Sequence, residues 1–318
     1  MPASRAAVSD TDGPKPSGFY AAHSAQEIRA LREHPQFPAA LRFLATGLVD
    51  LYDGNLLLNQ VLNDRGRLVL SFLVLYLHFS GRADGLPGGF TTSRLTAHCV
   101  EAGICSPGRA VAMLALMRFG GYLQLAPSTT DRRAKVLVPT DRMIAVVQKR
   151  LTHQFGALAL LLPEGGEALA RLPDIDFIAA LSRRLGERFL AGARLTPHAP
   201  ELHPFMERNA GLIMVLSLFL AGKPDDTFPP TKPVRISISA LARRFAVSRP
   251  HVMNLLRDAE QEGFLRRDGQ QGEDIVVLPR LAEAVQNLFA TIFLFQAESA
   301  REALADLKSG TSAGATDL

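Results

Sequence analysis

The sequence predicts a mainly α-helical protein with two small β-hairpins, in which one succession of elements is used twice. Three observations support this prediction. Hydrophobic residues make up 47% of the 318 residues, enough to fill the cores of two ordinary domains. β-branched residues gather in only a few short runs, whereas apolar residues elsewhere recur at helical spacing. The third observation is an internal repeat with a period of about 140 residues.

The repeat is clearest where SPGRAVAMLALMRFGGYL at 106–123 aligns with SRPHVMNLLRDAEQEGFL at 248–265, an offset of 142 residues. Downstream, VLVP at 136–139 aligns with VVLP at 276–279, an offset of 140 residues. Small differences in loop length produce such a drift. The ordered series of matches therefore predicts a duplicated architecture.

The second copy gives the elements in order. Residues 237–245 carry apolar side chains at i, i+3, i+4 and i+7, which predicts a helix. Ser248 is placed to cap a second helix, and Gly263 is placed to end it. The β-prone segments 264–267 and 275–278 then predict a hairpin. Helix, short turn, helix and hairpin make a winged helix-turn-helix unit, which lays its second helix in the DNA major groove.

The first copy repeats this succession. A helix is expected over about Thr91–Glu101, and Ser106 is placed to cap a second helix that ends at Gly121. The segments 122–126 and 135–138 predict its hairpin. The predicted fold class is therefore mainly α with small β-hairpin wings, as two winged helix-turn-helix units joined by long helices.

The first hairpin resembles the wing of the MarR family of transcription regulators. Its tip and second strand read Asp131-Arg132-Arg133-Ala134-Lys135-Val136-Leu137-Val138-Pro139-Thr140. The family's wing reads Asp-x-Arg, a short strand, and Leu-Thr opening the next helix, so Pro139 is the one departure. The resemblance implies that Arg133 reaches the DNA minor groove while Asp131 steadies the wing. The second wing has no Arg at its tip and carries two acids, which puts the same role in doubt there.

The chain divides into a disordered tail (1–18), a first helical and winged repeat (19–165), a second one (166–307) and a disordered tail (308–318). Flanking helices are expected at 36–63, 66–80 and 141–161 in the first repeat, and at 174–191, 203–221 and 280–307 in the second. MarR-family members pair through long terminal helices. The resemblance therefore implies that the tandem chain mimics a two-fold dimer.

The candidate DNA-binding residues are the polar and cationic side chains of the two units. They are Ser106, Arg109, Arg132, Arg133 and Lys135 in the first unit, and Arg243, Arg244, Arg249, His251 and Asn254 in the second. Arg and Asn suit guanine and adenine edges, and cations suit phosphates. The second helix of the first unit offers few polar side chains. Modest base readout is expected there, with much of the affinity coming from phosphates and the wing.

The charge, the cysteines and the apolar segments limit which partners and which compartment the chain can have. The net charge is +4; residues 1–150 hold 17 Lys and Arg against 11 Asp and Glu, whereas residues 151–318 hold 18 against 20. Two cysteines are too few for a disulfide framework, and small buried residues explain both better than a redox sensor does. The N-terminus lacks an apolar core, and the longest charge-free apolar stretches are shorter than the ~20 residues of a membrane span. A cytoplasmic protein without membrane contact is expected.

We therefore expect a bacterial transcription regulator that binds double-stranded DNA. It is not expected to be an enzyme or to hold a metal or cofactor, because no phosphate-binding loop, nucleophile elbow or metal-ligand spacing is present. Two alternatives stay open: a plasmid-type replication initiator, which also uses tandem winged helices, and a winged-helix protein-interaction module without DNA binding. The sequence also leaves open a small-molecule effector and a homodimer.

Overall fold

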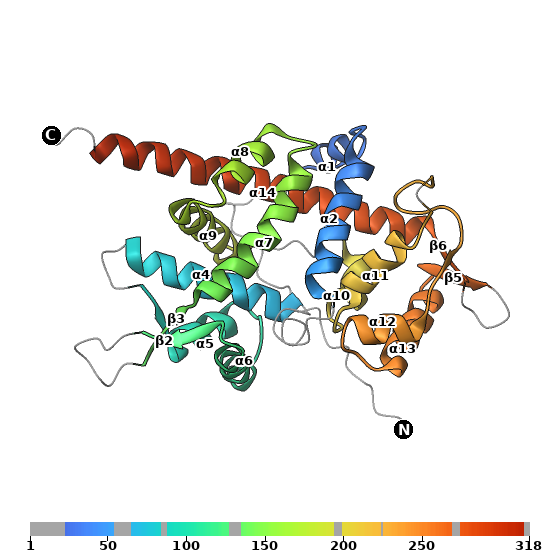
Figure 1. The fold of residues 1–318 in the computed structure, drawn as a ribbon, viewed down its shortest axis with the longest axis horizontal. Coiled ribbons are helices and arrows are strands. Elements are labelled where there is room, and N and C mark those ends of the chain that lie inside the picture. Colours follow the sequence, from blue (N-terminus) through green and yellow to red (C-terminus); the bar gives the residue numbers. More distant parts are fainter. Residues whose placement is uncertain are drawn as a thin grey trace, which may run out of the picture.

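The computed structural model describes residues 23–53, 65–83, 88–126, 135–193, 199–223, 225–268 and 274–314. Over these ranges the protein is mainly helical and holds two antiparallel three-stranded sheets (Figure 1). The prediction of a mainly α protein with small β elements is confirmed. Within the same ranges, none of the helices combines the length and the apolar character needed to cross a lipid bilayer.

The helices of the first half are α1 (Ala25–Arg32), α2 (Phe37–Tyr52), α4 (Arg65–Ala83), α5 (Thr92–Glu101), α6 (Pro107–Phe119) and α7 (Asp141–Leu158). Those of the second half are α8 (Pro163–Arg171), α9 (Ile175–Leu190), the 3₁₀ helix η2 (Pro200–Leu202), α10 (His203–Met206), α11 (Gly211–Leu220), α12 (Ile238–Arg244), α13 (Arg249–Gln261) and α14 (Pro279–Gly314). The strands are β1 (Phe90–Thr91), β2 (Leu123–Leu125), β3 (Val136–Pro139), β4 (Val234–Arg235), β5 (Leu265–Asp268) and β6 (Asp274–Val277). We call β1 to β3 with α5 and α6 the first unit, and β4 to β6 with α12 and α13 the second unit.

The predicted helix boundaries in both units are found at the expected residues. Ser106 caps α6 by accepting a hydrogen bond from the backbone N–H of Arg109, and Ser248 caps α13 by accepting one from that of His251. A glycine follows each helix in the left-handed region, where a Cβ would be strained: Gly121 at φ 71° and Gly263 at φ 70°. The two helices therefore begin and end by the same local chemistry.

A short strand that sequence analysis missed completes each sheet. β1 and β4 add to the hairpins, giving the orders β1-β3-β2 and β4-β6-β5. Phe90 lies opposite Leu137 in the first sheet, and Val234 lies opposite Ile275 in the second. The two units thus share one element order and one sheet order.

The helix after each hairpin is attached to its unit by the same pair of contacts. Arg142 of α7 donates to the carbonyl of Gly120 at 2.8 Å, and its guanidinium lies 4.8 Å from the ring centre of Tyr122. Arg280 of α14 donates to the carbonyl of Glu262 at 2.6 Å, and its guanidinium lies 4.5 Å from the ring centre of Phe264. These contacts fix the direction in which α7 and α14 leave the units.

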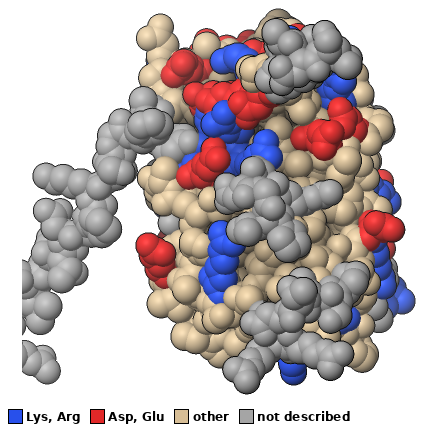
Figure 2. All heavy atoms as spheres, turned by 90° about the vertical axis from the view of Figure 1, so that its left-hand side faces the viewer, with Lys and Arg blue, Asp and Glu red and all other residues tan. Residues whose placement is uncertain are grey.

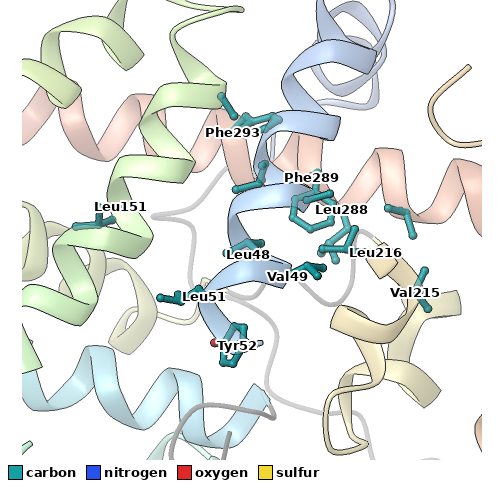
Figure 3. Packing of buried hydrophobic residues seen from close by; sticks show 14 of the residues in the cluster. Leu48, Val49, Leu51, Tyr52, Leu151, Val215, Leu216, Leu288, Phe289 and Phe293 are labelled. Atoms are coloured by element: carbon teal, nitrogen blue, oxygen red, sulfur yellow. The ribbon is translucent and has the colours of Figure 1, made fainter. Parts of the chain in front are cut away.

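The helices that precede the two units each pack on helices of both halves. α2 packs on α7 of its own half and on α11 of the other; α9 packs on α14 of its own half and on α4 of the other. Likewise α1 lies on α14, as α8 lies on α7. Figure 3 shows α2 between these neighbours, with Leu48 and Val49 among the buried side chains of α11 and α14. The halves therefore share one core.

Three helices differ in length from their predictions. The helix expected over 36–63 ends at Tyr52, because the following residue, Asp53, is extended. The helix expected over 203–221 is divided into α10 and α11, because Ala210 between them takes a left-handed conformation that a continuous helix cannot contain. α14 continues to Gly314, so the predicted tail from residue 308 begins as helix.

The predicted boundary between residues 165 and 166 falls inside α8, so the second succession of helices starts at Pro163. The tail predicted at 1–18 lies outside the described residues.

Candidate nucleic-acid interface

α6 and α13 lie along the same edge of the molecule, opposite α14 (Figure 1). The β2–β3 and β5–β6 hairpins lie toward the two ends of the molecule. One edge therefore carries both second helices, and each is flanked by the hairpin of its own unit.

The two helices bury matching positions and expose matching positions. The buried residues are Ala110, Met113, Leu114 and Met117 on α6, and Val252, Leu255, Leu256 and Ala259 on α13, each pair 142 residues apart. On the exposed side the same offset pairs Val111 with Met253, Ala112 with Asn254, and Ala115 with Arg257. We call these exposed positions the outer face of each helix.

The outer face of α13 carries a polar and a cationic side chain beside Met253, which is 51% exposed. Asn254 and Arg257 are exposed, and Arg257 approaches its neighbour Asp258 at 3.3 Å while its side chain stays 56% exposed. At the start of the helix, Arg249 donates to the hydroxyl of Ser239. Arg249 lines a shallow hollow between α12 and α13 together with Arg243, which is also exposed. Of the predicted residues, Arg243 and Arg249 therefore share one hollow, and Asn254 is exposed further along α13.

His251 and Arg244 were also predicted to contact DNA, but the structure engages both side chains elsewhere. A ring nitrogen of His251 lies 3.0 Å from the carbonyl oxygen of Asn209, in the connection between α10 and α11. Arg244 pairs with Asp53 at 3.0 Å and with Asp50 at 3.4 Å. These contacts attach the second unit to the helical body.

The cations of the second hairpin are neutralised within the hairpin and its neighbours. Arg235 pairs with Asp274 at 3.1 Å, and Arg266 pairs with Asp268 at 3.1 Å. The hydrogen bond from Arg266 holds the pKa of Asp268 below its ordinary value, because it stabilises the charged carboxylate. These strands consequently present little net positive charge to a phosphate.

Arg267 is engaged in the same way. It pairs with Glu260 of α13 at 2.6 Å, and its hydrogen bonds lower the pKa of that carboxyl group. The negative charge of Glu260 therefore offsets the positive charge of Arg267 on the side of α13 that packs against the hairpin.

The first unit exposes cations that are spread around its helices. Of the predicted residues, Arg109 and Lys135 are exposed, while the hydroxyl of Ser106 serves as the helix cap. Asp131, Arg132 and Arg133 lie outside the described residues. Sequence reasoning missed Arg94 on α5, which is exposed close to the start of that helix. A basic residue in the first turn of the first helix was the available signal.

The outer face of α6 is apolar, in contrast to that of α13. Val111 is 48% exposed and Phe119 at the end of α6 is 83% exposed. Val111 and Val100 line a shallow hollow between α5 and α6, whose rim carries Lys135 and Glu101. Figure 2 shows the end of the molecule that holds this unit. Charged residues of both signs gather near its top, and the described surface lower down is mainly uncharged.

The two cysteines are neighbours: Cys99 lies in α5, and Cys105 lies in the turn between α5 and α6. Cys99 is buried, and this burial, with Cys105 as the neighbouring group, raises the pKa of its thiol to about 12. A thiol with so high a pKa is a poor nucleophile, which fits a packing role. Among the residues that the structure describes, no three His, Cys, Asp or Glu side chains gather in a way that could hold a metal ion.

No protein-family model, no curated protein and no solved structure matches this chain.

Proposed function

We propose that this chain is a transcription regulator that binds double-stranded DNA through both units, each acting as a winged helix-turn-helix domain similar to those of the MarR family. The observation that carries the proposal is the recurrence of one unit, with the same sheet order and the same helix caps, on a single edge of the molecule. Two free cysteines suit a reducing compartment, so we place its action in the cytoplasm.

The dimensions of duplex DNA set what the proposed arrangement requires. A helix with its side chains is ~10–12 Å across and fits the major groove, which is ~12 Å wide. Paired helices of this kind enter successive major grooves about one turn, or ~34 Å, apart. The packing of α2 on α11 and of α9 on α4 joins the two halves in one core, which limits how far the spacing of the two units can change. A single chain then acts as a two-fold dimer does.

The side chains of the second unit supply direct readout. Asn254 can make paired hydrogen bonds with an adenine edge, and Arg257 can do so with guanine. Arg243 and Arg249, which share the hollow at the start of α13, are placed to approach the phosphates that flank the groove. His251 and Arg244 are left out of this set, since both make contacts to the helical body.

The test is selection of bound duplexes from a randomised pool with the full chain, followed by titration at two salt concentrations. Retention of a defined sequence, with affinity that falls steeply as salt rises, is expected because phosphate contacts release counterions. Asn254→Ala should weaken binding to the selected site by about 5- to 150-fold, since a bidentate base contact is worth ~1–3 kcal/mol. Gln261→Ala, exposed at the far end of the same helix, is the control and should bind as the wild type does.

The proposal fails if no duplex is enriched, or if binding does not respond to salt. It also fails if Asn254→Ala and the control bind equally well while both keep the circular dichroism spectrum of the wild type.

A protein-interaction module is the second candidate, and one observation favours it. Phe119 is 83% exposed on α6 and lies beside Leu125, itself 45% exposed, so the first unit shows apolar surface of a kind that marks interaction sites. Under this alternative the selection enriches no duplex, and the chain instead retains a protein through a surface that Phe119→Ser disrupts.

A further inference from the structure

The two second helices carry different chemistry at equivalent positions. The positions buried on α6 are the positions buried on α13, so the helices sit in their units in the same register. Val111 and Ala112 therefore occupy the places that Met253 and Asn254 occupy in the second unit. Any difference in what the helices recognise lies in these side chains.

None of the three positions that define the outer face of α6, Val111, Ala112 and Ala115, carries a side chain that could hydrogen-bond to a base edge; Arg109 and Arg118 are exposed nearer the two ends of the helix. Gly108, Val111, Ala112 and Ala115 are all exposed, and Val111 is the largest of them. Valine and alanine neither donate nor accept hydrogen bonds, so this face cannot distinguish guanine from adenine by their polar groups. What it can recognise in a major groove is an apolar group.

Thymine carries the one apolar group among the base edges of the major groove, its C5 methyl group. The small side chains of α6 allow the helix backbone to approach the groove floor closely. Around this face the rim is polar: Thr91 and Ser93 lie at the start of α5, and Lys135 lies at the start of the hairpin strand. Glu101 stands at the opposite end of α5, where its carboxylate is 81% exposed to solvent.

We propose that the half-site under α6 is recognised through thymine methyl groups, while the half-site under α13 is recognised through hydrogen bonds to adenine and guanine. The proposal rests on the DNA binding proposed above and names the class of site. It makes the bound sequence non-palindromic, although the two units share one fold. The T-rich half is the one that lies against the first unit.

The test uses the duplex selected by the full chain. Thymines are replaced by deoxyuridine, which keeps base pairing and removes only the methyl group, in one half-site at a time. The half under α13 is identified as the half whose base changes no longer matter in Asn254→Ala. Affinity is measured by fluorescence anisotropy at fixed salt.

Each contacted methyl group that is removed under α6 should weaken binding about fourfold, the worth of one buried methyl-sized group. The same replacement under α13 should change affinity by less than about twofold. Val111→Ala, which keeps the helix and removes two methyl groups, should reduce the penalty of deoxyuridine. Met253→Ala at the equivalent position of α13 is the control and should leave that penalty unchanged.

The failures are distinguishable. If no duplex is enriched, the proposed DNA binding itself fails. If a duplex is enriched but deoxyuridine has no effect, or the same effect in both halves, DNA binding stands and the thymine proposal is overturned. The proposal is also overturned if the amides of α13, but not those of α6, are protected from hydrogen exchange by the duplex. In that case the apolar face is free for a protein.

Discussion

Two arginines of α9 reach carboxylates of α14, and they differ chiefly in burial. The side chain of Arg188 is 4% exposed and pairs with Glu298 and Glu302. The side chain of Arg184 is 36% exposed and pairs with Asp306 at 2.6 Å. The two arginines lie one helical turn apart, so they form a matched pair for testing what holds α9 on α14.

Arg188→Ala should destabilise the protein far more than Arg184→Ala. Removing one partner of a fully buried ion pair costs ~3–5 kcal/mol. The carboxylates of Glu298 and Glu302 are 43% and 41% exposed, so water replaces part of the lost interaction and we expect ~2–4 kcal/mol. Arg184→Ala loses contacts between groups that water already reaches, for which ~0–1 kcal/mol is expected.

Urea unfolding followed by circular dichroism measures both losses, from the shift in midpoint at an unchanged slope. Arg188→Met should recover part of the loss, because it keeps a long apolar stem at this buried position without the guanidinium, which lies 5.7 Å from the ring centre of Phe295. Equal losses for the two alanine variants, or a larger loss for Arg184→Ala, would refute the view that burial decides the strength of these pairs.

Three further predictions concern packing, pH and thiol reactivity. Gly165→Ala should destabilise the protein, because the added Cβ would lie 2.2 Å from a backbone nitrogen. Gly166→Ala has open space around the added Cβ and should stabilise the protein by up to ~1 kcal/mol. Equal urea midpoints for the two variants would contradict this. Hydrogen bonds from the loop lower the pKa of Asp226 from 3.8 to about 2, so its stabilisation is present above pH 4 and is lost as the pH falls toward 2. Asp226→Asn should consequently show a smaller drop in urea midpoint over that range than the wild type, and a parallel drop would exclude this role. Burial raises the pKa of the Cys99 thiol to about 12, so iodoacetamide at pH 8 should label Cys105 before Cys99. Mass spectrometry measures the two labelling rates, and equal rates would argue against a buried Cys99 thiol.

The sequence predicts the elements whose signals are local. Ser106 and Ser248 cap their helices, and glycines end them, because capping is decided within four residues. β1 and β4 left no such signal. A two-residue strand is too short to show alternation, and each is defined only by pairing with a strand about 40 residues further on.

The packing of α2 and α9 on helices of the other half also could not be predicted. α2 is apolar on several sides, which indicates burial but not whether the neighbour comes from the same repeat or the other. Only the packed structure shows that α11 and α7 lie on either side of it.

The residues of the candidate site likewise divide into those whose position the local sequence predicts and those whose contacts it does not predict. Helical periodicity places Asn254 on the outer face of α13, as expected. It does not show that Arg244 pairs with Asp53 or that His251 lies against Asn209, since both partners are distant in the chain. The role of Arg133 stays a prediction.

If one chain contacts two successive major grooves, its footprint on the selected duplex has two parts. Hydroxyl-radical footprinting of that duplex, with stoichiometry from analytical ultracentrifugation, measures this. Two protected patches are expected on one face of the duplex, about 10 base pairs apart centre to centre, with one chain bound per duplex. A single protected patch, or two patches that form only when two chains are bound, would contradict it.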